Sequence, residues 1–151
     1  MTGYFYNPNI HPYLEYQKRL ATLLGYAAGE ALPVVSDVAY PMEIFLRRVQ
    51  FQEEDRCRHC YDLRLRCTAE KAKGENYEAF TTTLLYSRYQ KHELIKETGE
   101  RMADEYGVPF LYHDFREGWR EGVETSKRLG LYRQPYCGCL YSEKERYWRR
   151  K

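Results

Sequence analysis

Four of the five cysteines, arranged in two pairs, are the residues whose type and spacing best suit chemistry. Cys57 and Cys60 form a CxxC pair beside Arg56 and Arg58, at the expected start of a helix. The positive end of a helix and neighbouring guanidinium groups favour the thiolate, the form that binds zinc or iron–sulfur clusters. One CxxC supplies only part of such a ligand set, so a metal or redox role is expected, with a chance pair as the alternative.

The second group is the segment Cys137-Gly138-Cys139. A glycine between two cysteines lets them close a small, strained disulfide ring, and strained disulfides cycle readily. The pair therefore suits the storage or transfer of two electrons. The alternative is a zinc site built from the CxxC and CxC cysteines together. Cys67 shares a helical face with Cys60, and we expect it to be a small core residue.

The number of cysteines is odd and no secretory signal opens the chain, which argues against a disulfide framework and indicates a reducing compartment. No apolar run approaches the roughly 18–20 residues of a membrane span. We therefore expect a cytoplasmic protein with no membrane partner.

Three other side chains are candidates for an acid or a substrate contact. His11 lies in a proline-bounded loop after an expected strand, Asp37 follows a second strand, and His92 opens a helix. Isolated histidines are more often structural or exposed, and an aspartate after a strand is often a helix cap. The sequence has no P-loop, no GxGxxG and no serine-centred elbow, so nucleotide hydrolysis and NAD-linked hydride transfer gain no support.

Composition bounds the architecture. The chain has 151 residues, is 43% hydrophobic and 30% charged, and can bury the core of one domain. Its net charge of +2 does not demand a nucleic-acid partner. The final run KERYWRRK (residues 144–151) interleaves cations with aromatic rings, which suits phosphate contact and base stacking. A frayed basic tail is the alternative reading of that run.

Alternating strands and helices must position these residues. The spacing of apolar residues predicts strands at residues 2–6, 33–36, 79–85 and 108–112. It predicts helices at residues 13–28, 41–49, 58–73, 92–106, 116–129 and 142–150. This order implies βαβ units and a mainly parallel sheet with flanking helices, in one α/β domain over residues 1–151. Because the chain opens inside a strand, we expect an element to be absent before it.

Five motifs together resemble one known family, from end to end of the chain. They are TGYFYNPNIHPY (2–13), RCRHCYDLRL (56–65), AFTTTLLYSRYQKHELIKETG (79–99), FLYHDFREG (110–118) and LGLYRQPYCGCLYS (129–142). They resemble the QueH-type, cobalamin-independent epoxyqueuosine reductases. The resemblance implies a Rossmann-like α/β fold related to adenine-nucleotide α-hydrolases. It also implies reduction of the epoxide of epoxyqueuosine in the tRNA anticodon to queuosine, the last step of queuosine synthesis.

Carried over by motif, Cys57 and Cys60 would be two ligands of a 4Fe-4S cluster, with an iron beside it, and Cys137 and Cys139 would be the redox-active pair. The implied partners are tRNA carrying epoxyqueuosine and an external electron donor. Family members start with a strand ending in CCxPC, whose cysteines supply two more ligands, and this sequence has no such segment. We therefore expect an N-terminally truncated member without the first strand. The alternatives are an inactive relic and a non-catalytic, zinc-stabilised tRNA-binding module.

Overall fold

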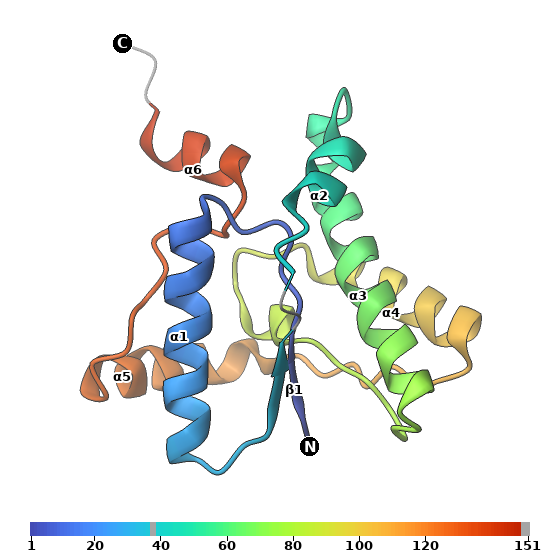
Figure 1. The fold of residues 1–151 in the computed structure, drawn as a ribbon, viewed down its shortest axis with the longest axis horizontal. Helices are drawn as coiled ribbons and strands as arrows, with labels where there is room; N and C mark the ends of the chain where they lie inside the picture. The colour runs from blue at the N-terminus through green and yellow to red at the C-terminus, as the bar shows by residue number, and fades with distance from the viewer. Residues whose placement is uncertain (37–38, 149–151) are drawn as a thin grey trace. The chain divides into compact units, whose positions relative to one another are not determined.

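The computed structural model describes residues 1–36 and 39–148. The chain forms two compact units: one combines Met1–Glu53 with Arg128–Lys151, and the other is Glu54–Lys127 (Figure 1). Asp37 and the last three residues of the basic tail lie outside the described residues. The prediction for Asp37 therefore stays a prediction.

The first unit is built on a βαβ element. Strands β1 (Gly3–Phe5) and β2 (Val34–Ser36) are connected through helix α1 (Tyr13–Gly29), and they pair in parallel with Gly3 opposite Val34. In Figure 1, α1 runs beside the two strands. The predictions of a strand, a helix and a second strand over this part of the chain are confirmed.

A small aromatic cluster joins α1 to β1. Phe5, Ile10 and Tyr16 are buried together, and the rings of Phe5 and Tyr16 meet edge to face at 5.3 Å between centroids. Partly buried side chains packed against them are Leu20, Leu23 and Tyr40. Burial of each large apolar side chain contributes roughly 1.5–3 kcal/mol. The cluster therefore fixes both the helix and the loop that carries Ile10.

Two shorter helices complete the first unit. Helix α2 (Met42–Val49) begins one residue after the predicted start, because Pro41 is its N-cap. It buries Phe45 and Val49, which are four residues apart and so share a face. Helix α6 (Leu140–Tyr147) begins two residues before the predicted start, because Cys139 caps it. A helix is thus present at both predicted places.

The second unit pairs two long helices. Helices α3 (Arg56–Gly74) and α4 (His92–Tyr106) lie side by side (Figure 1). Side-chain pairs between them repeat at a constant sequence separation of 39, so the helices run in the same direction. These pairs are Arg58–Glu97, Arg101–Asp62 and Arg66–Glu105. Gly107, in the left-handed conformation with φ of 68°, ends α4 at the predicted stop.

The predictions of strands at residues 79–85 and 108–112 were wrong. Only an isolated parallel bridge forms there, between Phe80 and Phe110. Directly after it, the hydroxyl of Thr82 accepts a hydrogen bond from the backbone N–H of Leu84 and caps the 3-10 helix η2 (Thr83–Tyr86). The threonines therefore end an extended segment instead of prolonging it, because a threonine hydroxyl competes for backbone hydrogen bonds.

The remaining predicted helix, at residues 116–129, is divided. A 3-10 helix η3 (Phe115–Gly118), capped by Asp114, leads into α5 (Trp119–Arg128). A third 3-10 helix, η1 (Glu53–Asp55), lies between the helices predicted at residues 41–49 and 58–73, and α3 follows it at once.

The fold class is α/β with parallel strand pairing, as predicted, but in the described residues the sheet has two strands instead of the four predicted. A larger, Rossmann-like sheet is not confirmed. None of the described helices combines the length and the apolar character needed to cross a bilayer.

Candidate functional site

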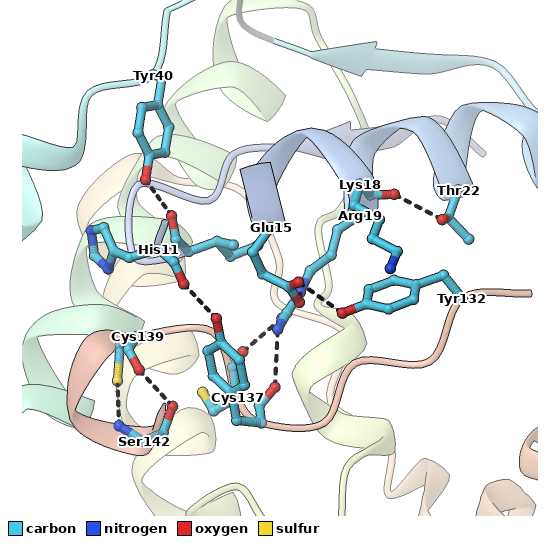
Figure 2. Close-up of polar contacts among 12 residues, drawn as sticks. His11, Glu15, Lys18, Arg19, Thr22, Tyr40, Tyr132, Cys137, Cys139 and Ser142 are labelled. Atoms are coloured by element: carbon cyan, nitrogen blue, oxygen red, sulfur yellow. Dashed lines mark hydrogen bonds and ion pairs between the residues drawn. The ribbon is translucent and has the colours of Figure 1, made fainter. Parts of the chain in front are cut away.

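The CGC segment (residues 137–139) lies immediately before α6 and is fixed by groups from the N-terminal part of the chain. The Arg19 guanidinium of α1 donates to two successive carbonyls, from Nη2 to Tyr136 at 3.0 Å and from Nη1 to Cys137 at 2.9 Å. Figure 2 shows Arg19 pointing toward Cys137. The backbone N–H of His11 donates to the next carbonyl, that of the glycine, at 2.8 Å. Three consecutive carbonyls, those of Tyr136, Cys137 and Gly138, are thus held by groups from the N-terminal part of the chain.

Arg19 is itself fixed by a carboxylate and a tyrosine. Its Nε lies 2.7 Å from Oε1 of Glu15, and the side chains of this pair are only 9% and 11% exposed. The Tyr132 hydroxyl donates to the other carboxylate oxygen at 2.7 Å, and Lys18 Nζ lies 3.9 Å from the centroid of the Tyr132 ring. Burial, and then the hydrogen bond to Glu15, raises the pKa of Tyr132 to about 12. This tyrosine therefore stays a hydrogen-bond donor at neutral pH.

A second tyrosine ties the segment to the loop before α1. The Tyr136 hydroxyl donates to the backbone carbonyl of His11 at 2.6 Å. Burial is the main cause that raises the pKa of Tyr136 to about 12, so this donor too keeps its proton. Together with the reverse bond from the His11 N–H, it couples the two loops in both directions.

The CGC segment lies so close to Ile10 and Arg19 that its middle position, residue 138, requires glycine. The φ of Gly138 is 133°, in a region that side-chain-bearing residues rarely adopt. A Cβ placed there would lie 3.0 Å from Cγ1 of Ile10 and 3.1 Å from Nη1 of Arg19. Backbone conformation and space both therefore favour glycine between the two cysteines.

The two cysteines of this segment have different surroundings. Cys137 is exposed, whereas Cys139 is 7% exposed. Cys139 is the residue that caps α6: its Sγ accepts the backbone N–H of Ser142 at 3.4 Å, and the Ser142 hydroxyl donates to the Cys139 carbonyl at 2.8 Å (Figure 2). The start of a helix stabilises negative charge on such a sulfur.

His11 is buried beside the CGC segment, and its ring nitrogens are not hydrogen-bonded within the described residues. The residue is 3% exposed, and neither ring nitrogen has a hydrogen-bond partner among the described residues. Its ring centroid lies 5.6 Å from that of Phe45 and 6.4 Å from that of Tyr40. Burial lowers the pKa of His11, which favours the neutral ring. A neutral imidazole offers one donor and one acceptor, and buried polar groups normally have partners.

Asn9 shares this property. It is 2% exposed, and its Oδ1 has no partner among the described residues. Its Nδ2 lies 3.6 Å from the position of a Cβ on Gly138. Sequence reasoning missed Asn9, and the only available signal was a polar residue within a short proline-bounded loop.

The CxxC pair lies in the second unit, in the first turns of α3. Cys57 is half-buried and Cys60 is buried, and their spacing of three residues places both on one helical face. The first turn of α3 carries no acidic residue, and the positive helix end favours the thiolates. The three acidic residues of η1 (Glu53–Asp55), directly before the helix, act in the opposite direction. Cys67, expected in the core, is half-buried.

His92 lies in the same unit, at the first position of α4. It is 6% exposed, and its ring nitrogens also lack partners within the part of the chain that the structure describes. The loop before it is fixed on α3, because the Tyr61 hydroxyl donates to Gln90 at 2.7 Å and accepts the N–H of Lys91 at 3.2 Å. The charge of a protonated His92 would add to the Arg116 guanidinium, which is the main group holding the pKa of Asp114 below its usual range.

The described residues within either unit gather no group of three histidine, cysteine, aspartate or glutamate side chains around one point. The thiol chemistry and shared face of Cys57 and Cys60 nevertheless fit two of the four thiolates that an iron–sulfur cluster takes. His11 is brought to the CGC segment, as its position in a loop after a strand allowed. Sequence reasoning missed the Arg19, Glu15, Tyr132 and Tyr136 network, because its partners lie far apart in the chain.

Comparison with known proteins gives a consistent result. A family profile described as "Epoxyqueuosine reductase QueH" matches residues 1–145. A protein of that name from Dehalococcoides mccartyi is 41% identical over 144 residues, which cover 95% of this chain and 79% of that protein. The Thermotoga maritima protein of the same name is 38% identical over 154 residues, with the same two coverages of 95% and 79%. The Haemophilus influenzae protein is 36% identical over 152 residues, covering 93% and 60%.

Proposed function

Because this chain belongs to the QueH family of epoxyqueuosine reductases, we propose that it is an oxidoreductase that reduces the epoxide of epoxyqueuosine in tRNA to queuosine. The observation that carries the proposal is the family match over residues 1–145. The relatives carry the name of this reductase, and the geometry of the CGC segment is compatible with redox chemistry.

The reaction needs two electrons and two protons. Both carbon–oxygen bonds of the epoxide break, a carbon–carbon double bond forms, and the oxygen leaves as water. Oxidation of two thiols to one disulfide releases two electrons and two protons. Oxidation of one dithiol pair therefore supplies the electrons and protons that reduction of one epoxide consumes.

Cys137 and Cys139 are the proposed source of these electrons. They are separated by one glycine whose backbone conformation brings the chain close to α1. The hydrogen bonds from Arg19 and His11 fix the backbone on which both thiols are carried. A fixed backbone lowers the entropic cost of bringing two sulfurs together.

Cys57 and Cys60 are the proposed protein ligands of an iron–sulfur cluster in the second unit. When bound, such a cluster supplies electron transfer, and an iron with an open position, in it or beside it, supplies Lewis acidity. The contribution of α3 is to present two thiols on one face at its positive end. The arginine-rich surroundings lower the cost of holding negative thiolates there.

His11 is proposed as a substrate contact. Its pKa is lowered by burial, so at neutral pH the ring favours a hydrogen bond over donation of a full proton. Both nitrogens are available within the described residues, and a polar ligand that reached them would remove the cost of an unsatisfied buried ring. His92, buried with an equally unsatisfied ring, is proposed in the same role.

The end of α6 is proposed to contact RNA. Tyr147 and Trp148 are 58% and 57% exposed, and Lys144 Nζ lies 5.3 Å from the centroid of the Trp148 ring. Exposed aromatic faces stack on unpaired bases and cations contact phosphates, which suits an anticodon loop. These side chains support a tRNA partner.

The direct test is an anaerobic assay with tRNA that carries epoxyqueuosine, a chemical reductant and nucleoside analysis by mass spectrometry. We expect queuosine to accumulate over many turnovers with the unaltered chain and not with the Cys137→Ser/Cys139→Ser variant. Cys67→Ser is the matched control and should retain activity. Unchanged epoxyqueuosine with the unaltered chain would contradict the proposal.

Metal analysis of the same sample separates the reductase from a binding module. Iron with acid-labile sulfide and a brown colour supports the cluster at Cys57 and Cys60. Zinc in a colourless protein that binds tRNA without reducing it supports the zinc-stabilised module.

A further inference from the structure

The two CGC cysteines differ in exposure, which suggests that they have different roles when the pair is reduced. The Cys137 side chain is exposed, whereas Cys139 is 7% exposed and caps α6. A bulky reagent that reaches the pair from solvent therefore meets Cys137 first. Disulfide exchange requires access to the sulfur that is attacked.

The environment of Cys139 suits a departing sulfur. When a disulfide is opened, one sulfur leaves with the electron pair, and exchange is faster when that charge is stabilised. Cys139 Sγ already accepts the Ser142 N–H at the start of α6, a position that stabilises negative charge (Figure 2). Cys139 is therefore suited both to leave and to stay protected from direct attack.

The backbone of the segment holds this arrangement in place. Arg19 fixes the carbonyl of Cys137, His11 fixes that of Gly138, and Ser142 fixes that of Cys139. The peptide groups are held while Cys137 stays exposed. The sulfur that is attacked and the sulfur that leaves are thus distinguished by the fold.

We propose that an external dithiol reduces the Cys137–Cys139 disulfide by attacking Cys137, with Cys139 as the leaving thiolate. This inference rests on the proposed redox role of the pair. One thiolate of the donor bonds to Cys137 Sγ, the Cys137–Cys139 bond breaks, and its electron pair leaves on Cys139. The second donor thiol then attacks the donor sulfur of the mixed disulfide and releases Cys137. The donor becomes a disulfide, and its two protons and two electrons restore both cysteines.

We expect the donor to carry two thiols, because Cys139 cannot complete the reduction of the mixed disulfide between Cys137 and the donor. Attack by Cys139 on Cys137 would only restore the starting disulfide and expel the donor. A second thiol on the same donor acts at high effective concentration and completes the reduction. The expected partner class is a small reductant or protein with an exposed vicinal dithiol.

The test traps the mixed disulfide on the unaltered chain. Oxidation with diamide forms the Cys137–Cys139 disulfide, which is verified by peptide mapping. A brief reaction with glutathione is stopped with acid, and remaining thiols are alkylated with N-ethylmaleimide in denaturant. We expect glutathione on Cys137 and the maleimide on Cys139.

The outcomes separate this inference from the proposed function. Glutathione on Cys139, or equally on both sulfurs, would overturn the assignment and leave the redox pair intact. Failure to form the disulfide would remove the redox pair and the inference with it. Cys67→Ser should give the unaltered pattern. As a second measurement, Cys137 in the Cys139→Ser variant should react with a bulky aromatic disulfide about tenfold or more faster than Cys139 in Cys137→Ser.

Discussion

The CGC segment of the first unit is held by Arg19, which lies 118 positions before Cys137 in the chain, whereas the CxxC pair of the second unit lies inside a regular helix. Around the CGC segment the supporting ion pair is nearly buried, with side chains 9% and 11% exposed. Between α3 and α4 the pairs are more exposed: the side chains of Arg58 and Glu97 are 51% and 64% exposed, and those of Arg101 and Asp62 are 49% and 17% exposed. One cysteine segment therefore depends on a few buried contacts, and the other on helix geometry.

This difference predicts unequal sensitivity to single substitutions. Loss of one partner from a buried, hydrogen-bonded charge pair leaves an unsatisfied charge, whereas a solvated pair loses little. The predictions below move from the most sensitive contact to the least.

The largest effect is expected from Arg19→Met. It removes the donors to two carbonyls and leaves the Glu15 carboxylate without its guanidinium, at a cost of about 3–5 kcal/mol in unfolding free energy. Urea unfolding would measure it, with Arg101→Met as the matched control, because Arg101 is 49% exposed where it pairs with Asp62. Arg19→Lys should recover part of the loss. Equal costs at Arg19 and Arg101 would contradict the comparison.

Gly138→Ala is expected to come next. The new Cβ meets Ile10 and Arg19 at a φ of 133°, and such backbone strain costs about 1–3 kcal/mol. It should also slow formation of the Cys137–Cys139 disulfide with diamide. Gly25→Ala is the control, because beyond the neighbouring backbone of α1 no described atom lies within 4 Å of its Cβ position, and the change should stabilise the helix slightly. A tolerated Gly138→Ala with normal disulfide formation would show that the loop is not held as described.

A pH-dependent effect is expected from His11. Burial lowers its pKa in the folded state, so the unfolded chain binds the proton more readily. The stability of the neutral ring is present above the ordinary pKa of 6.5 and is lost as pH falls below it, by up to about 1.4 kcal/mol per pH unit. Urea unfolding between pH 7.5 and about 5 would measure the slope. His11→Asn should flatten it, and an unchanged slope would place the effect elsewhere.

The smallest effect is expected from the solvated pairs of the second unit. Arg58→Gln should change the unfolding free energy by less than about 1 kcal/mol, because the ion pair with Glu97 is exposed. Added salt should reduce even that difference. A large, salt-independent loss of unfolding free energy would mean that the ion pairs between α3 and α4 stabilise the fold more than their exposure indicates.

The sequence was most informative where a local signal sets the structure. The bounds of α4 were predicted as residues 92–106, because Gly107 can adopt the left-handed conformation that ends the helix. The strand predicted at residues 79–85 failed because β-branched threonines favour strands by propensity, while the Thr82 hydroxyl caps a 3-10 turn here. Propensity counts the residue type and not the hydrogen bond that its side chain makes.

The candidate site was predicted only in part, for a related reason. The cysteine motifs and His11 were found from their types and spacing, since these are local. The spacing of Glu15 and Arg19 indicates an ion pair within α1, yet nothing local shows that the guanidinium also binds the carbonyls of Tyr136 and Cys137. Such contacts follow from the tertiary path of the chain.

The measurement that tests the central claim most directly is a single-turnover reaction of the pre-reduced, metal-loaded protein in excess over tRNA that carries epoxyqueuosine. Queuosine and the oxidation state of Cys137 and Cys139 would be determined in the same samples by mass spectrometry. The account predicts one Cys137–Cys139 disulfide for each queuosine formed. Queuosine produced while both cysteines remain thiols would contradict it.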